Sequence, residues 1–318
     1  MTLDQTEGPR FRFVPFAVRR PRAAALLLLA LLACLALGRP LAPVRLGEVA
    51  ERYALPITPP ADQGDTGLCW VYATLSMLET NYMQRHPGER VDLSRAALQR
   101  DAIKDRFSRR IRGETGSLGD GGLAVEALAL IRANGLLEQD DFPRVVPSQP
   151  VILSIERKLA DYSASEDKRT ALNAELDATL GAVPHVTHLG AKSVTPPDLA
   201  RTMLGGKRWV EFDLARDGVE GWGASQDPDA REDTLVRYVT LDRLIDLIHE
   251  SLRRGEAVVG GTKDHALLIY GADYDRDGDP VAYLIKDSLA PYVYRLDASA
   301  VHAQLNDVTV SMDVAGDV

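Results

Sequence analysis

Cys69 has the setting in this sequence that best suits a nucleophile. The apolar positions Val71, Leu75, Leu78 and Tyr82 follow it at helical spacing, which predicts a helix that begins near Cys69. Unpaired backbone N–H groups and the positive dipole end of a first helical turn stabilise a thiolate, the nucleophilic form of cysteine. A lone cysteine is more often a small buried apolar residue, so its surroundings must decide.

The loop before Cys69 contains the residue types that an attack on a carbonyl group needs. Residues 63–70 read QGDTGLCW, with two glycines that permit a tight loop. Gln63 lies six residues before Cys69, so its amide can point at the oxygen that becomes negative when a thiolate attacks a carbonyl. Together with the backbone N–H of Cys69 it would form an oxyanion hole. These residues predict covalent chemistry at Cys69.

Residues 63–73 (QGDTGLCWVYA) resemble the active-site segment of papain-like cysteine peptidases, in which Gln, Gly, Cys-Trp and an aromatic-Ala pair stand at the same offsets. Further segments are similar to that family in the same order along the chain: Leu93-Ser94, GDGG at 119–122, His265-Ala266 and IKDS at 285–288. The similarity covers residues 62–143 and 236–296. Between them, TPPDLARTML at 195–204 and the helix before GEAVVGG are loosely similar to bleomycin hydrolase and its bacterial aminopeptidase relatives.

The resemblance implies roles for seven residues. Cys69 would be the nucleophile, His265 its catalytic histidine and Gln63 the oxyanion donor. Asp287 replaces the family's asparagine, and a carboxylate there can accept a hydrogen bond from the imidazole, favour the imidazolium and so raise the pKa of His265. The resemblance also implies three substrate-binding residues, which are Gly121, Gly122 and Trp70. It implies no cofactor and no metal.

Three further residues stand at positions that the resemblance makes informative. Leu289 stands where the family has a tryptophan that shields the histidine from water, so Leu289 must shield it or the contact is wetter. Glu79 and Lys286 match a structural ion pair of the family, and we expect no catalytic role for them.

The pattern along the chain predicts helices first and strands last. Helices are expected after Cys69, after Ser94 as an N-cap, and over 125–137, with Gly135 near the end of the third. The segments AVVGG, HALLIYG, VAYLIKD and YVYRL after residue 256 predict strands. This order indicates an α+β fold, and the resemblance implies the papain-like two-lobe form, a helical lobe plus an antiparallel β lobe.

The predicted organisation has five parts. Residues 1–38 form an export segment, 39–61 a linker with an entry strand, 62–150 the helical lobe, 151–235 a largely helical insertion and 236–318 the β lobe. In and after the insertion, helices are expected over 152–162, 172–180, from Thr195 and over 244–252. Trp209 and Trp222 are expected to pack inside the insertion.

The first 38 residues predict export. RRPR at 19–22 precedes sixteen uncharged residues dominated by Leu and Ala. Such a helix spans about 24 Å, short of a hydrocarbon core of about 30 Å. Three interpretations stay open: a signal cleaved after ALG at 36–38, an uncleaved signal-anchor, or a lipobox with lipid on Cys34. All three place residues 39–318 at the periplasmic or extracellular face of a membrane.

Composition excludes several classes of protein. Of the 318 residues, 45% are hydrophobic and 26% charged, as in a folded globular chain. The overall charge is −9, and since residues 1–38 carry five arginines against two acids, the remainder carries −12. The acidic charge of residues 39–318 argues against a nucleic-acid partner. A chain with two cysteines also cannot be a disulfide scaffold.

The other histidines and acidic runs predict no metal site. His185 and His188 lack a matching ligand cluster. The aspartates of 273–279 begin like a calcium loop but are expected to form a hairpin turn, because position 12 is Leu284. His86, His249 and His302 are expected at the surface.

The sequence as a whole predicts an exported thiol peptidase that acts on peptide or protein substrates, attached to a membrane only if the N-terminal segment is retained. Two alternatives stay open. One is a catalytically inactive papain-like domain that binds a peptide or a partner at the membrane. The other is a transglutaminase-like acyltransferase, which would pass the acyl group to an amine. The sequence does not indicate an oligomeric state.

Overall fold

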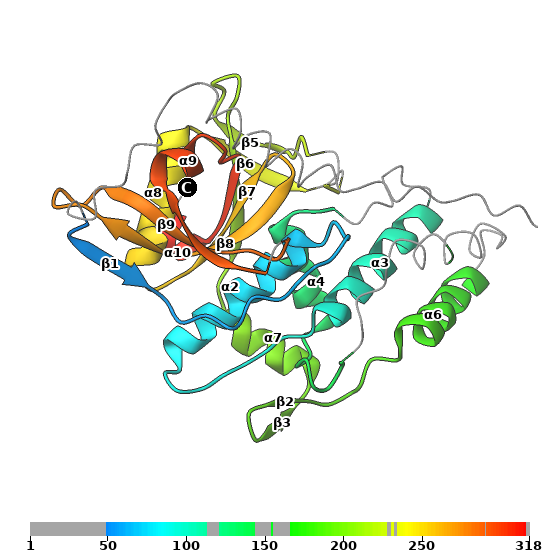
Figure 1. Ribbon diagram of the computed structural model, residues 1–318. Helices are drawn as coiled ribbons and strands as arrows, with labels where there is room; N and C mark the ends of the chain where they lie inside the picture. The colour runs from blue at the N-terminus through cyan, green and yellow to red at the C-terminus, as the bar shows by residue number, and fades with distance from the viewer. Residues whose placement is uncertain are drawn as a thin grey trace, which may run out of the picture. The chain divides into compact units, whose positions relative to one another are not determined.

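The computed structural model describes residues 49–112, 121–143, 154, 166–227, 230–231, 234–289 and 291–315. Within this part, several helices pack beside a nine-stranded, mostly antiparallel sheet (Figure 1). The N-terminal export segment and the helix expected over 152–162, apart from residue 154, lie outside the described residues. No helix among those described is long and apolar enough to span a membrane.

The helix that begins at Cys69 is the centre of the helical region. α2 (Cys69–Arg85) is buried without interruption from Trp70 to Met83, because the sheet covers one side and other helices cover the rest. It packs against β8 and against α4 (Figure 1). The other helices are α3 (Arg95–Ile111), α4 (Ala124–Asn134), α6 (Glu166–Leu180), α7 (Pro196–Leu204), α8 (Leu241–Arg253), α9 (Ala298–His302) and α10 (Met312–Ala315).

The sheet has the order β10-β9-β8-β7-β11-β4-β6-β5, and β1 pairs with β8 beside this path. Its pairs are antiparallel except β4 with β6. The expected entry strand and the four C-terminal strands are confirmed. The strands are β1 (Glu51–Ala54), β4 (Trp209–Leu214), β5 (Gly221–Ala224), β6 (Leu235–Val239), β7 (Val258–Thr262), β8 (His265–Tyr274), β9 (Pro280–Lys286), β10 (Val293–Asp297) and β11 (Asp307–Ser311).

Residues 166–239 are less helical than the sequence pattern predicts. The helical contribution is α6 and α7, which lie on either side of a small hairpin of β2 (Thr187–Leu189) and β3 (Lys192–Val194). Beyond them, β4, β5 and β6 join the main sheet, with β4 hydrogen-bonded to β11 from the far end of the chain. The apolar and acidic residues of β4 alternate, which is typical of a strand, so the interpretation of this region as largely helical passed over a real signal. The two glycines of β5 weaken its strand pattern.

Other expectations in this region have mixed outcomes. Thr195 caps α7, accepting a hydrogen bond from Asp198 N at 3.3 Å, as predicted. Trp209 is buried, but Trp222 is 52% exposed, so its predicted packing role is wrong. It lies on β5 at the edge of the sheet, with the Arg237 guanidinium over its ring, 5.9 Å from the ring centroid.

Of the three histidines expected at the surface, one is exposed and two are not. His86 is exposed, as predicted. His249 is buried and His302 half-buried, because both face the hydroxyl of Tyr283, at 2.8 and 2.9 Å from their Nε2 atoms. Burial lowers the pKa of His249 to about 4, so this histidine is neutral at pH 7.

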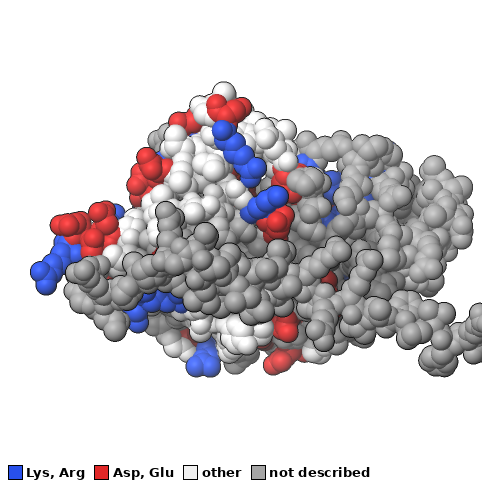
Figure 2. All heavy atoms as spheres, turned by 45° about the horizontal axis from the view of Figure 1, so that its top comes forward, with Lys and Arg blue, Asp and Glu red and all other residues white. Residues whose placement is uncertain are grey.

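Charged side chains are interspersed on the face shown in Figure 2. Acidic and basic residues alternate there with uncharged surface, and the described residues of this face present no broad basic area. Such a face lacks the cluster of Lys and Arg that phosphate binding needs.

Candidate active site

Cys69 is the first residue of α2, as predicted. Leu68 precedes it with non-helical backbone angles, so the helix begins abruptly at the cysteine, and the first turn contains no acidic residue. Cys69 is half-buried and forms no disulfide. The thiol therefore stands at the positive end of a helix dipole that no carboxylate of its own turn opposes.

The Gln63 loop is tied to the strand that carries Asp287. The backbone N–H of Gln63 donates to Ser288 O at 2.9 Å, and Ser288 Oγ donates to Gln63 Oε1 at 2.7 Å. The amide Nε2 donates to Thr66 O at 2.6 Å, which fixes its orientation inside the loop. An amide nitrogen has two hydrogens, so one is left for an oxyanion. Sequence reasoning missed Ser288, whose hydroxyl holds Gln63.

His265 and Asp287 form the closest charged pair of the site. His265 begins β8 and Asp287 follows the end of β9, and these strands are antiparallel neighbours. His265 Nε2 lies 2.7 Å from Asp287 Oδ1, and the two side chains are 17% and 12% exposed. The side chain of Cys69 lies close enough to the ring to raise its pKa, and both residues line the same cavity. The histidine thus neighbours both the cysteine and the carboxylate.

The pKa of His265 is raised despite burial. Burial by itself lowers it, but the hydrogen bonds and charges of Asp287 and Cys69 outweigh that effect and raise the pKa to about 9. Burial likewise raises the pKa of Asp287, yet the hydrogen bond and charge of His265 lower it overall. At neutral pH the arrangement favours an imidazolium beside a carboxylate.

Tyr294 takes part in covering this pair, a contact that sequence reasoning missed. Its Oη donates to Asp287 Oδ2 at 2.8 Å from β10, and the backbone N–H of Leu289 donates to Oδ1 at 2.9 Å. Leu289 itself is 51% exposed, so its side chain does not replace the shielding tryptophan of similar peptidases. The sequence signal for this contact was an aromatic residue seven positions after Asp287. The register of the strands was needed to show that this residue reaches Asp287.

Replacing Tyr294 by phenylalanine is expected to lower the free energy of unfolding by about 1.5–3 kcal/mol, the range for a hydrogen bond to a charged group. The reason is that a half-buried carboxylate loses one donor. Urea unfolding followed by circular dichroism measures the change. Tyr292→Phe is the matched control, because Tyr292 lies just before β10 and is 64% exposed. Equal stability of the two variants would show that the Tyr294 contact contributes nothing.

A cavity of about 240 Å³ opens beside the cysteine. It is lined by Cys69, His265, Gly121 and Gly122 together with residues of β4, β7 and β11. A Cβ on Gly122 would lie 3.0 Å from the Trp70 ring, so the glycine allows the backbone to lie directly on the indole. Trp70 is buried, and its ring supports Gly122. The substrate-binding role that the resemblance implies for Trp70 stays a prediction.

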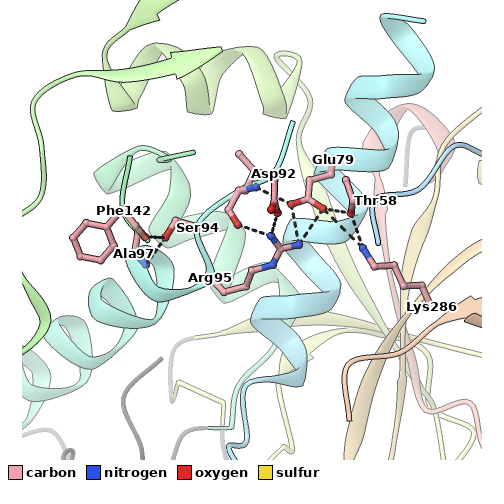
Figure 3. Close-up of polar contacts among 9 residues, drawn as sticks. Thr58, Glu79, Asp92, Ser94, Arg95, Ala97, Phe142 and Lys286 are labelled. Carbon is pink, nitrogen blue, oxygen red and sulfur yellow. Dashed lines mark hydrogen bonds and ion pairs between the residues drawn. The ribbon is translucent and has the colours of Figure 1, made fainter. Parts of the chain in front are cut away.

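A buried charge network joins the two sides of the site (Figure 3). Glu79 of α2 lies 2.9 Å from Arg95 of α3 and 3.9 Å from Lys286, the residue before Asp287. Thr58 Oγ1 donates to Glu79 at 2.6 Å and accepts from Lys286 Nζ at 2.7 Å. The expected Glu79–Lys286 pair is present, and Arg95 and Thr58 extend it.

The described residues show no group of three or more side chains that could hold a metal ion. His188 is paired with Asp141 instead, at 2.8 Å from Nδ1 to Oδ1. The aspartates of 275–279 form the turn between β8 and β9, with Asp275 Oδ1 accepting from two backbone N–H groups of the same turn. The predicted hairpin turn is confirmed.

Comparison with known proteins identifies the fold. No family model and no curated protein matches the sequence. The solved structure of PepW from Lactobacillus rhamnosis HN001 matches with a TM-score of 0.64 at 14% identity, over 93% of this chain and 90% of that one. Xylellain, a cysteine protease from Xylella fastidiosa, gives 0.36 at 12% identity over 83% and 87%, and the ragweed pollen cysteine protease Amb a 11 in its proform gives 0.42 at 12% over 84% and 66%. The chain has the mixed α+β, papain-like fold of cysteine peptidases.

Proposed function

We propose that this protein is an exported cysteine-type peptidase that hydrolyses peptide bonds in peptide or protein substrates. The observation that carries the proposal is the placement of His265 between Cys69 and Asp287, at the edge of a cavity that Gly121 and Gly122 also line. Export rests on the basic and apolar pattern of residues 19–38, and a retained segment would anchor the protein to the membrane.

In the acylation step, the Cys69 thiolate attacks the carbonyl carbon of the scissile bond. The carbonyl oxygen takes the negative charge and accepts hydrogen bonds from the free Nε2–H of Gln63 and the backbone N–H of Cys69. His265, held as an imidazolium by Asp287, donates its proton to the leaving nitrogen. The C–N bond breaks, and the acyl group remains on sulfur as a thioester.

In the deacylation step, neutral His265 accepts a proton from a water molecule, which attacks the thioester carbonyl. The C–S bond breaks, the carboxylic acid leaves, and Cys69 returns as a thiolate beside the imidazolium. Asp287 keeps the ring oriented in both steps through the 2.7 Å contact with Nε2. Gly121 and Gly122 offer backbone groups to an extended substrate, because they have no side chains in the way.

The direct test is product analysis of a peptide mixture treated with the full chain and with Cys69→Ser. We expect new amino and carboxyl ends that disappear in the variant. An added primary amine discriminates between hydrolysis and acyl transfer, since transfer would leave the acyl group on the amine. Products joined to the amine in place of free acids would overturn the peptidase proposal, and so would tight peptide binding without any cleavage.

A further inference from the structure

The lining of the cavity beside Cys69 contains several acidic residues. Besides Cys69 and His265, it includes Glu211, Asp307 and Asp227. The side chain of Glu211 belongs to a residue that is 1% exposed, so its carboxyl group is buried and meets the outside through this cavity. A substrate group that enters beside the nucleophile therefore shares the cavity with carboxyl groups.

The strand pairing brings the carboxyl groups together. Glu211 and Asp213 are two residues apart on β4, so they lie on the same face of the sheet. Asp307 of β11 is directly opposite Asp213, and it lines the same cavity as Glu211. Its carboxylate also covers Gly261 of β7, where a Cβ would lie about 2 Å from both oxygens. Like charges opposite each other on neighbouring strands are destabilising, so the fold maintains this group at a cost.

Glu211 and Asp307 differ from two other acids that the fold buries. Glu79 is neutralised by Arg95 and Lys286, and Asp273 by arginines on either side of it. Among the described residues, neither Glu211 nor Asp307 forms an ion pair with a lysine or arginine. Glu211 Oε2 instead accepts from two neutral donors, Thr309 Oγ1 at 2.5 Å and Val125 N at 3.2 Å. The described residues thus supply Glu211 with hydrogen bonds and with no ion-pair partner.

Two further observations concern the charge of this group. Asp213, which does not line the cavity, has an Oδ1 atom that is buried without a hydrogen-bond partner. Burial and the neighbouring carboxylates raise the pKa of Asp213 to about 7 and the pKa of Asp307 well above its usual range. The basic residue of the described lining, Lys263, is exposed, so water screens its charge. A cation that entered the cavity would be stabilised by the carboxyl groups of Glu211 and Asp307, which line it.

We propose that this cavity binds a cationic group of the substrate, so that the enzyme cleaves peptides with a positive charge close to the scissile bond. The group is an ammonium or guanidinium, from a Lys or Arg side chain or from the free N-terminus of the peptide. The inference rests on the proposed function, because it takes the cavity at Cys69 as the substrate site. It adds the substrate class, for which Glu211 and Asp307 are the specificity residues.

The test compares fluorogenic peptides that differ in one charge. Arginine is exchanged for its neutral analogue citrulline, and lysine for norleucine, at each of three positions before the scissile bond. Each peptide is made with a free and with an acetylated N-terminus. We expect kcat/KM of the full chain to be at least about tenfold higher for the cationic member of a pair, which corresponds to about 1.4 kcal/mol. The side-chain exchanges and the acetylated peptides together identify whether a side chain or the N-terminus supplies the bound cation.

The variants are Asp307→Asn and Glu211→Gln, with Asp217→Asn as the control that changes the net charge equally. Asp217 lies in the exposed turn before β5 and accepts a hydrogen bond from Val219 N that asparagine can also accept. The preference is expected to fall below threefold in the first two variants and to persist in the control. Asp307→Asn should also raise the Tm, because it relieves the opposition to Asp213, so loss of folding does not explain its effect.

A binding experiment tests the inference even if no peptide is cleaved. Peptides that occupy the cavity slow the alkylation of Cys69 by iodoacetamide, and the cationic member of a pair should protect at a concentration at least tenfold lower. Equal cleavage and equal protection by charged and neutral peptides would overturn this inference and leave the peptidase proposal standing. Protection by cationic peptides without any cleavage would overturn the peptidase proposal alone.

Discussion

Replacing His265 by alanine is expected to lower kcat/KM for peptide hydrolysis by about 10²–10⁴-fold, the usual contribution of a positioned acid–base group. His265 hydrogen-bonds with Asp287 and lines the same cavity as Cys69, whose side chain raises its pKa. Its loss removes the proton donor for the leaving amine and the cation beside the thiolate. Progress curves with a fluorogenic peptide at pH 7 measure the effect, and circular dichroism confirms that the variant is folded.

His188→Ala is the matched control, because His188 also pairs with an aspartate. Its Nδ1 lies 2.8 Å from Asp141 Oδ1, but its side chain is 48% exposed on β2, and it does not line the cavity. Its replacement should leave kcat/KM within a factor of two of the wild-type value. A His265→Ala variant that keeps more than a tenth of the wild-type activity would contradict the assigned role.

Replacing Glu79 by glutamine is expected to lower the free energy of unfolding by about 3–5 kcal/mol, as when one partner of a buried ion pair is removed. Glu79 is buried within α2, and the variant leaves Arg95 and Lys286 without their shared countercharge (Figure 3). Burial already lowers the pKa of Lys286 to about 8 despite the charge of Glu79. Urea unfolding at pH 7 measures the loss.

Glu250→Gln provides the comparison for that experiment, since Glu250 forms an ion pair with Arg243 on the surface of α8. The side chains are 39% and 32% exposed, so the same chemical change is expected to alter stability by less than about 1 kcal/mol. Because Lys286 is adjacent to Asp287, we also expect Glu79→Gln to reduce kcat/KM. Equal losses of stability at the two glutamates would show that the buried network stabilises the protein no more than a surface ion pair does.

The elements beside the nucleophile could be predicted because their signals are local. α8 shows why: Leu244, Leu247, Ile248 and Leu252 recur at helical spacing, and all four are fully buried in the structure. β4 shows the limit. Its alternation of apolar and acidic residues is typical of a strand, but a six-residue pattern does not indicate that its partner is β11, from the far end of the chain.

The contacts of the catalytic residues likewise differ in whether local sequence predicts them or strand pairing determines them. The loop chemistry around Cys69 could be interpreted from neighbouring residues, whereas the roles of His265 and Asp287 came from resemblance. Their 22-residue separation closes only because β8 and β9 pair in the register that sets Leu268 opposite Lys286. The contact of Tyr294 with Asp287 depends on a second register, that of β9 with β10. No local pattern in the sequence indicates which side of the sheet the Tyr294 hydroxyl reaches.

The most direct test of the account is the rate at which iodoacetamide alkylates Cys69 as a function of pH, in the full chain and in His265→Ala. Peptide mapping separates Cys69 from Cys34. Since the pKa of His265 is raised to about 9, the imidazolium is present at pH 6 and is lost as the pH rises through 9. We predict fast labelling of the wild type at pH 6, at least about tenfold slower labelling of the variant there, and convergence of the two rates near pH 10. Labelling that rises only above pH 8, and equally in both proteins, would contradict a histidine-stabilised thiolate and with it the proposed peptidase mechanism.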